Sequence, residues 1–194
     1  MLLRNWYDLF GTFTGVVLLT LAALPVAVLA VWALSRRRIA LGGTLAGSWL
    51  TSLSEIGLVY GTVPPVWLTL LPGGPSETDP HRVSLVPFHD MSMIIAAGPM
   101  TAAGQIGGNL LVFASLGFFG PLRFPALASV PRILALAATC STTVETAQYV
   151  LRLDRVASVD DVLLNTAGAG LAALASLPLR HVTAAPALSG AGPR

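Results

Sequence analysis

An acidic side chain lies inside an apolar stretch of the sequence, where it could do acid–base or ion-binding chemistry. Ser141 is followed by Glu145, Gln148 and Arg152 at distances of four, seven and eleven residues. This spacing places the four side chains on one face of a helix. A charge at the centre of a bilayer costs about 2.5–3.5 kcal/mol, so an acid in such a helix is a functional candidate by default.

A second polar group begins the next apolar run, in the stretch SVDDVLLNTAGAG. Asp161, Asn165 and Gly168 share one helix face in this run. Ser158, followed three residues later by Asp161, also resembles a capping box, and Asp160 adds negative charge to the same helix N-terminus. Helix capping therefore stays open as the whole explanation for both acids.

Polar side chains from other apolar runs are expected at a similar depth below the same face of the membrane. At a rise of about 1.5 Å per residue, Glu145 lies about 9 Å, Asn165 about 10 Å and Glu55 about 7–8 Å from that face. Asn109 begins another run at a similar depth. Four helices would thus bring polar groups into one layer, and converging faces would line a polar pocket open to the outside.

The residue types indicate what such a pocket could do. The catalytic candidates are Glu145, Asp160 and Asp161. Paired acids could act as general acid and base or hold a divalent cation. The binding candidates are Asn109, Gln148, Arg152, Arg155 and Asn165. The arginines at the mouth would attract anions; no metal-ligand motif and no cofactor is predicted, and a divalent cation on the acids stays open.

Each of these residues also has a structural alternative. Asn109, Gln148 and Asn165 could form hydrogen bonds between helices, which contribute about 0.6 kcal/mol each in membranes. Glu145 could be neutral, or a structural partner of Arg152. Gly104 and Gly108 form a G-x-x-x-G pair, which predicts close helix contacts in the bundle.

The composition indicates the elements that must position these residues. The chain is 54% hydrophobic and 10% charged, against about 25% charged residues in soluble domains. Five apolar runs approach the roughly 20 residues that span a bilayer as a helix: 9–34, 39–60, 104–122, 131–151 and 159–179. The run at 91–103 is too short and predicts an interfacial or re-entrant piece. The predicted fold is an all-α integral membrane bundle of about five transmembrane helices.

Arginine counts give the expected orientation, because short cytoplasmic loops are rich in basic residues. With the N-terminus outside, seven arginines fall inside, including Arg36, Arg37 and Arg38, and four fall outside. We therefore expect a multi-pass protein of the cell membrane with a cytoplasmic C-terminus.

Residues 1–83 are expected to hold two helices and an outer loop, and residues 180–194 a disordered tail. The net charge of +2 and the absence of a basic, aromatic-interleaved patch exclude nucleic acid as an expected partner.

Four stretches of the chain resemble the VanZ-like family: SLVPF (84–88), GNLLVFASLGFFGPL (108–122), VETAQYV (144–150) and RVASVDDVLLNTAGAGLAAL (155–174). The matching positions are Asn109, Leu116, Gly117, Phe118, Glu145, Gln148, Arg155, Asp160, Asp161, Asn165 and Gly168. Ser84 stands where the family usually has Asn, and Ser115 where it often has Pro. The resemblance implies a VanZ-like domain at 84–179 and a link to low-level resistance to the glycopeptide antibiotic teicoplanin.

These observations support one leading hypothesis and three rivals. The leading hypothesis is an outward-facing pocket that engages a membrane lipid, a lipid-linked envelope precursor or a lipidated glycopeptide, with Glu145 as its central acid. One rival is an intramembrane enzyme acting on a lipid-linked substrate. A small transporter is disfavoured because the inner half of the spans shows no polar residues. The last rival is a structural partner of other membrane proteins.

Overall fold

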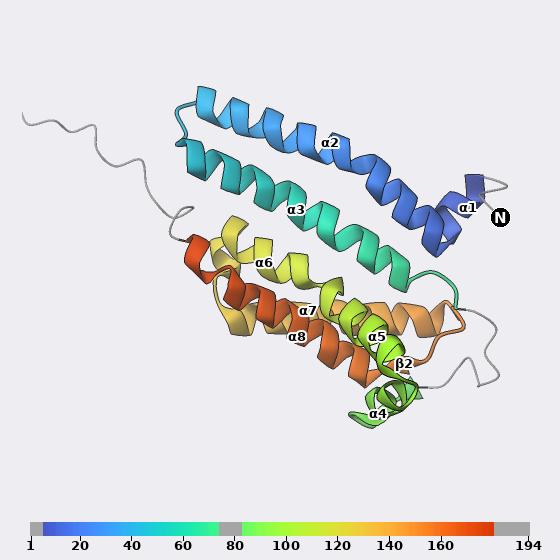
Figure 1. Ribbon diagram of the computed structural model, residues 1–194. Coiled ribbons are helices and arrows are strands. Elements are labelled where there is room, and N and C mark those ends of the chain that lie inside the picture. Colours follow the sequence, from blue (N-terminus) through green and yellow to red (C-terminus); the bar gives the residue numbers. More distant parts are fainter. Residues whose placement is uncertain (1–5, 74–82, 181–194) are drawn as a thin grey trace, which may run out of the picture.

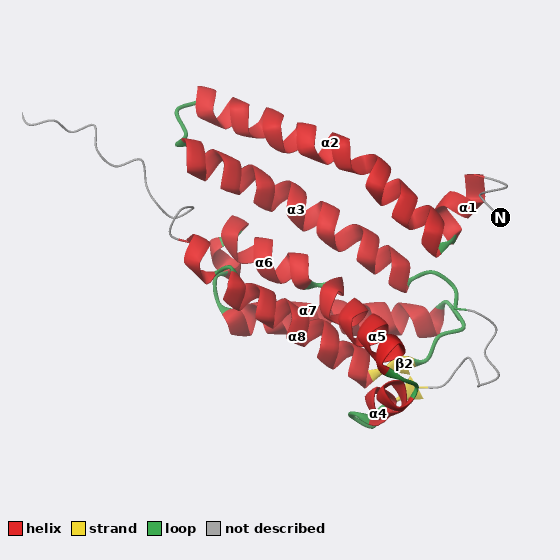
Figure 2. Cartoon of the chain, in the orientation of Figure 1, coloured by secondary structure: helices red, strands yellow, loops and turns green. Residues whose placement is uncertain are grey.

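Helices make up nearly all of the described structure, which confirms the predicted all-α class (Figures 1 and 2). The computed structural model describes residues 6–73 and 83–180. Its longer helices are α2 (Phe13–Ala40), α3 (Leu45–Thr69), α5 (Pro99–Val112), α6 (Ala114–Arg123), α7 (Val130–Val150) and α8 (Val159–Ala175). Its shorter elements are α1 (Trp6–Gly11), β1 (Val83–Ser84), α4 (His89–Ala96), η1 (Pro125–Leu127), β2 (Ala157–Ser158) and η2 (Leu177–Leu179).

The long helices run back and forth, so their connections gather at two ends of the bundle (Figure 1). One end holds the last turns of α2 and α6, with Arg36, Arg37, Arg38 and Arg123; we call it the arginine end. The other end holds α1, α4 and the short strands, and we call it the strand end. The two-residue strands β1 and β2 pair in parallel there, with Ser84 opposite Ser158.

Three helical segments are long and apolar enough to cross a membrane by length and composition. They are Phe13–Ala40, Pro99–Arg123 and Val159–Leu179, with mean hydropathies of 2.5, 1.4 and 1.6 in their most apolar windows. Two further helices, α3 and α7, also lie where the sequence predicts spans and contain 25 and 21 residues. Since these two are not among the apolar three, the count of five membrane spans stays a prediction.

The bounds of α3 differ most from the predicted span at 39–60. Gly42, at a φ of 93°, lies in the turn after α2, and the side chain of Thr44 caps α3 by accepting the Gly47 N–H at 3.2 Å. At the other end the helix continues through Pro64 and Pro65 to Thr69. Prolines usually interrupt a helix because they lack the N–H donor. The predicted end near residue 60 was wrong for that reason.

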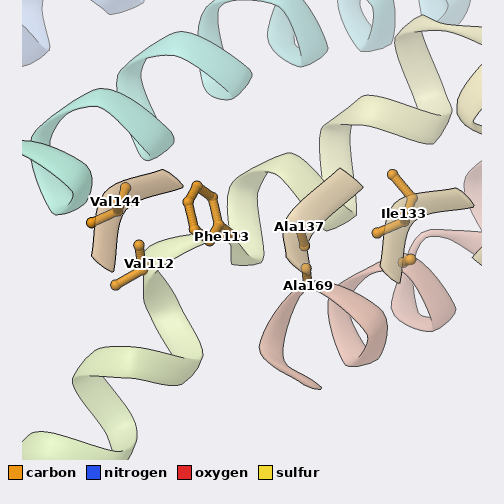
Figure 3. Packing of buried hydrophobic residues seen from close by; sticks show 7 residues of the cluster. Val112, Phe113, Ile133, Ala137, Val144 and Ala169 are labelled. Atoms are coloured by element: carbon orange, nitrogen blue, oxygen red, sulfur yellow. The ribbon is translucent and has the colours of Figure 1, made fainter. Parts of the chain in front are cut away.

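The third predicted span at 104–122 is two helices, with a break at Phe113 between α5 and α6. Phe113 is buried in the core, so the break turns its ring into the bundle (Figure 3). The apolar segment at 91–103 is likewise divided. Its first half belongs to α4, and Gly98, at a φ of 113°, turns the chain before Pro99 starts α5. A single short piece over 91–103 was therefore the wrong prediction.

The core is formed by small and medium apolar side chains between α5, α6, α7 and α8: Val112, Phe113, Ile133, Ala137, Val144, Ala169 and Ala173 (Figure 3). Two glycines let α8 approach its neighbours. A Cβ on Gly168 would overlap the carbonyl oxygen of Leu110 in α5, and one on Gly117 in α6 would overlap that of Ala169. Backbone contact this close is a general use of small residues in membrane bundles.

The predicted disordered tail at 180–194 lies outside the described residues except for Arg180. That residue is ordered at the arginine end, where its guanidinium donates to the carbonyl oxygens of Ala173 at 3.0 Å and Ala128 at 2.5 Å. Part of the outer loop predicted within residues 1–83 also lies outside the described residues, which omit 74–82.

We expect Gly168→Ala to lower the free energy of unfolding by about 1–3 kcal/mol, because the new methyl group must push α5 away from α8. Thermal unfolding in detergent micelles, followed by circular dichroism, measures the change. Gly107→Ala is the control, since a Cβ there meets nothing within 4 Å. Equal stability of the two variants would contradict the packing assigned to Gly168.

Candidate functional site

The N-terminus of α8 is the centre of a hydrogen-bond network at the strand end. Ser158 is the N-cap residue, and its Oγ accepts the Asp160 N–H at 3.2 Å. In a capping box the acid three residues later would accept the N–H of the cap residue. Here Glu145 of α7 takes that role, because its Oε2 accepts the Ser158 N–H at 2.9 Å. The predicted cap is present, but its second half comes from another helix.

Asp160 caps a different helix from the one that carries it. Its side chain is 1% exposed. Its two carboxylate oxygens accept the N–H groups of Phe88 at 2.6 Å and Met91 at 2.9 Å. These donors lie at the start of α4, which has no side-chain cap of its own from Phe88. Asp160 therefore anchors α4 to α8, and it is absent from the residues that line the cavity described next.

A cavity of about 700 Å³ opens at the strand end between α2, α3, α4, α5 and α8. Asp161 lines it and accepts a hydrogen bond from Nδ2 of Asn109. Asp90 also lines it and accepts from Oγ of Ser158 at 2.6 Å. The remaining lining is mostly apolar or small: Phe13, Pro65, Leu68, Thr69, Met93, Ile94, Gly104, Gln105, Gly108, Val112, Arg155 and Val156.

The two predicted anion contacts have different places. Arg155 lines the cavity, and its Nε donates to the carbonyl oxygen of Leu71 at 2.9 Å. Its Nη2 donates to that of Leu68 at 3.5 Å, so the guanidinium lies at the C-terminus of α3, where a cation is favourable. Arg152 is exposed in the turn after α7, with a φ of 55°, and does not line the cavity. The described residues contain no ion pair between Arg152 and Glu145.

Two of the predicted binding amides link helices. Nε2 of Gln148 donates to the carbonyl oxygen of Thr69 in α3 at 3.0 Å. Nδ2 of Asn165 donates to Oγ of Ser141 in α7 at 2.8 Å. These are the interhelical bonds that the structural alternative predicts, and neither amide lines the cavity. Asn109 is the predicted amide that does.

Gly104 and Gly108 were predicted to make close helix contacts, and that prediction was wrong. A Cβ added at either position meets nothing within 4 Å. Both glycines instead line the cavity, so α5 presents its bare backbone there and the space is kept open. Close contacts between a glycine and the backbone of another helix are made by Gly117 and Gly168.

Sequence reasoning missed Asp90 as a site residue. It lies in the first turn of α4, whereas its hydrogen-bond partner Ser158 is 68 residues further along the chain. No helical spacing relates the two. The available signal was an acid two residues after SLVPF, at the start of an apolar segment.

Glu55 was predicted in the same layer as Glu145, and the structure places it elsewhere. Its carboxylate pairs with Arg38 of α2 at 2.6 Å and with Nε of Arg123 of α6 at 2.6 Å, both near the arginine end. Arg38 also donates to Oγ of Ser52. The error follows from the bounds of α3, because a helix that extends to Thr69 puts Glu55 in its first half. Polar groups thus occur toward both ends, which removes the argument that was raised against a transporter.

The divalent cation on the acids stays a prediction. Residues 6–73 and 83–180 contain no group of three or more His, Cys, Asp or Glu side chains arranged to hold a metal ion. Asp90 and Asp161 share the cavity, and each already accepts a hydrogen bond from a neutral side chain.

We expect Asp160→Ala to lower the free energy of unfolding by about 1–2 kcal/mol, because two N–H groups lose their acceptor. Hydrogen exchange at the amides of Phe88 and Met91 should accelerate as well. Asp154→Asn, an acid change in the exposed turn at the same end, serves as control. Unchanged exchange at both amides would show that Asp160 does not hold α4.

We expect Glu55→Gln to lower the free energy of unfolding by about 1–2 kcal/mol, between the values for exposed and buried ion pairs. The Glu55 side chain is 25% exposed, so solvent screens part of the loss. Chemical denaturation of the single variants and of Glu55→Gln/Arg123→Gln gives the coupling energy. Strictly additive effects would mean that the pair does not stabilise the fold.

The comparisons with known proteins agree with the resemblance of the motifs. Residues 62–180 match the VanZ/LLP1 family, which is more than half of the chain. Searches of curated proteins and of solved structures find no match. The matched region contains α5 to α8, the strand pair and every polar residue of the cavity. The chain is a member of the VanZ/LLP1 family.

Proposed function

We propose that the cavity at the strand end binds the head group of an envelope lipid or of a lipid-linked envelope precursor. The observation that carries this proposal is the composition of the cavity. Its volume of about 700 Å³ lies within the range of ligand sites, which is about 300–1,000 Å³. Apolar side chains such as Leu68 and Val112 share its walls with Asp90, Asp161 and Arg155, so it suits an amphipathic molecule.

The polar contacts of the proposed ligand would come from four side chains. Asn109, held against Asp161, and Asp90, held by Ser158, present a carboxylate–amide surface. Arg155 supplies one guanidinium beside them. The carboxylates beside Arg155 favour a head group that carries hydrogen-bond donors as well as an anionic part. The sequence alone, with Arg152 and Arg155 together, had favoured a purely anionic ligand.

The side of the membrane is also part of the proposal. Arg36, Arg37, Arg38 and Arg123 gather at the arginine end, and basic residues favour the cytoplasmic side. The strand end, with its cavity, would then face outward, with the N-terminus outside and the C-terminus in the cytoplasm. In that leaflet the cavity would meet envelope lipids, which connects it with the teicoplanin resistance linked to VanZ-like proteins.

An enzyme acting on a lipid-linked substrate is the second candidate. Two carboxylates line one cavity, and Asp90 accepts a hydrogen bond from the Ser158 hydroxyl at 2.6 Å, so the cavity holds candidates for a general acid and a general base. Turnover of a defined lipid by the purified protein, lost in Asp161→Asn without loss of binding, would favour this candidate.

We expect Gly108→Leu to weaken lipid binding about tenfold or more, because Gly108 lines the cavity and an added Cβ there meets nothing within 4 Å, so the leucine side chain would occupy the ligand space. The probes are phosphatidylethanolamine, phosphatidylglycerol and an isoprenoid phosphate, each measured on purified protein by native mass spectrometry. Gly107→Leu is the matched control: it too enters open space, but it does not line the cavity. Equal retention of all probes by both variants would refute the proposal.

Charge at the site is tested by a second pair of variants. Asp161→Asn keeps an acceptor for Asn109 and removes the charge, whereas Asp154→Asn makes the same change in the exposed turn nearby. Binding and teicoplanin susceptibility should change for Asp161→Asn alone. Identical behaviour of the two variants, at equal expression, would argue against a role for the cavity carboxylate.

A further inference from the structure

A second, smaller pocket of about 330 Å³ lies at the strand end on the α7 side of β2. Glu145 is the only charged residue among the described residues that line it. The others are Val83, Leu85, Thr142, Thr146, Tyr149, Ala157, Ser158, Val159 and Val162. Ser158 borders both this pocket and the cavity, whereas Glu145 borders only this one.

One oxygen of the Glu145 carboxylate accepts a backbone hydrogen bond, and the other faces the pocket. The residue is 8% exposed, and Oε2 accepts the Ser158 N–H at 2.9 Å. Within residues 6–73 and 83–180, Oε1 accepts no hydrogen bond and no ion pair reaches Glu145. The charged groups near enough to act on it are Asp161 and Arg155, which oppose each other. The pocket therefore contains a carboxylate oxygen whose partner is missing.

The charge of Glu145 and the apolar walls of the pocket restrict which group can bind the second carboxylate oxygen. A buried carboxylate is stabilised when a cation donates hydrogen bonds to it, and such charge-assisted bonds are about twice as strong as neutral ones. The remaining walls are largely methyl and methylene groups, which favour a hydrocarbon next to the cation. Among the described residues that line the pocket, an anion would meet only the charge of Glu145, and a metal ion would find one carboxylate.

We propose that this pocket is a binding site for a primary ammonium group carried on a hydrocarbon, with its nitrogen on Oε1 of Glu145. The ammonium can belong to the head group of an aminolipid or to a soluble alkylamine. The site stands on the Glu145 pocket alone and does not depend on the ligand of the larger cavity.

The test is protection of Glu145 from dicyclohexylcarbodiimide, which attaches to carboxyl groups in apolar surroundings. Trypsin cleavage after Arg132 and Arg152 yields the peptide 133–152, in which Glu145 is the sole acidic side chain, so mass spectrometry assigns the label unambiguously. We expect octylammonium to protect Glu145. Octanol lacks the charge and octyltrimethylammonium lacks N–H donors, so both should protect at least about tenfold less well. Equal protection by the three compounds would overturn the proposal.

Calorimetric titration of octylammonium provides a result that does not depend on labelling. Glu145→Gln keeps an acceptor for the Ser158 N–H and removes the charge, so affinity should fall about tenfold or more. Thr146→Leu, which fills the pocket, should do the same. Thr143→Leu is the matched control, because Thr143 is exposed on the same helix, bonds the carbonyl four residues earlier as Thr146 does, and does not line the pocket. Unchanged affinity in Glu145→Gln and Thr146→Leu would refute the site.

Bilayer nanodiscs distinguish the two sources of the ammonium group. If the occupant is a lipid, phosphatidylethanolamine should protect Glu145 and phosphatidylcholine should not; if neither protects, a soluble amine is the occupant. Gly108→Leu, which blocks the larger cavity, should leave protection by octylammonium unchanged. Loss of protection in that variant would mean that the two spaces are one site, which refutes this proposal and leaves the proposed function standing.

Discussion

The strand end depends on one physical requirement: the N–H groups that begin a helix must find acceptors when little water reaches them. At the start of α8, Ser158 and Glu145 satisfy its own donors. At the start of α4, Asp160 of α8 does so. The acids of the VanZ/LLP1 region are therefore divided between holding backbone in place and facing open space. Asp160 belongs wholly to the first group, Glu145 to both, and Asp161 faces the cavity with Asn109 as its support.

The sequence predicted those parts of the site that depend on regular spacing within one helix. The face that carries Glu145 and Gln148, and the start of α8 at Ser158, were both found in this way. What spacing could not supply was contact between distant segments. Asp90 meets Ser158 only because β1 and β2 pair in parallel and bring the start of α4 to α8. Glu55 was misplaced because the end of α3 was predicted at a proline-rich point that the helix passes through.

Charged side chains are paired differently at the two ends of the bundle. Near the arginine end, one carboxylate is held between two guanidinium groups from α2 and α6, which ties the N-terminal hairpin to the family region. At the strand end, carboxylates outnumber the arginine that lines the cavity. Paired charges of the first kind fix how helices sit against each other, whereas the two cavity carboxylates accept hydrogen bonds from neutral side chains, and Asp90 also lies 3.2 Å from Nδ1 of His89.

Phe13 has a consequence for how such proteins diversify. It lines the cavity from α2, a helix that lies before the matched residues 62–180, whereas the polar groups of the cavity all lie within them. One residue of the cavity wall thus lies before the matched region, and the other wall residues lie within it together with the polar groups. A change at position 13 would alter the shape of the cavity wall while the acids stay constant, so this space can vary in form without any change in its polar groups.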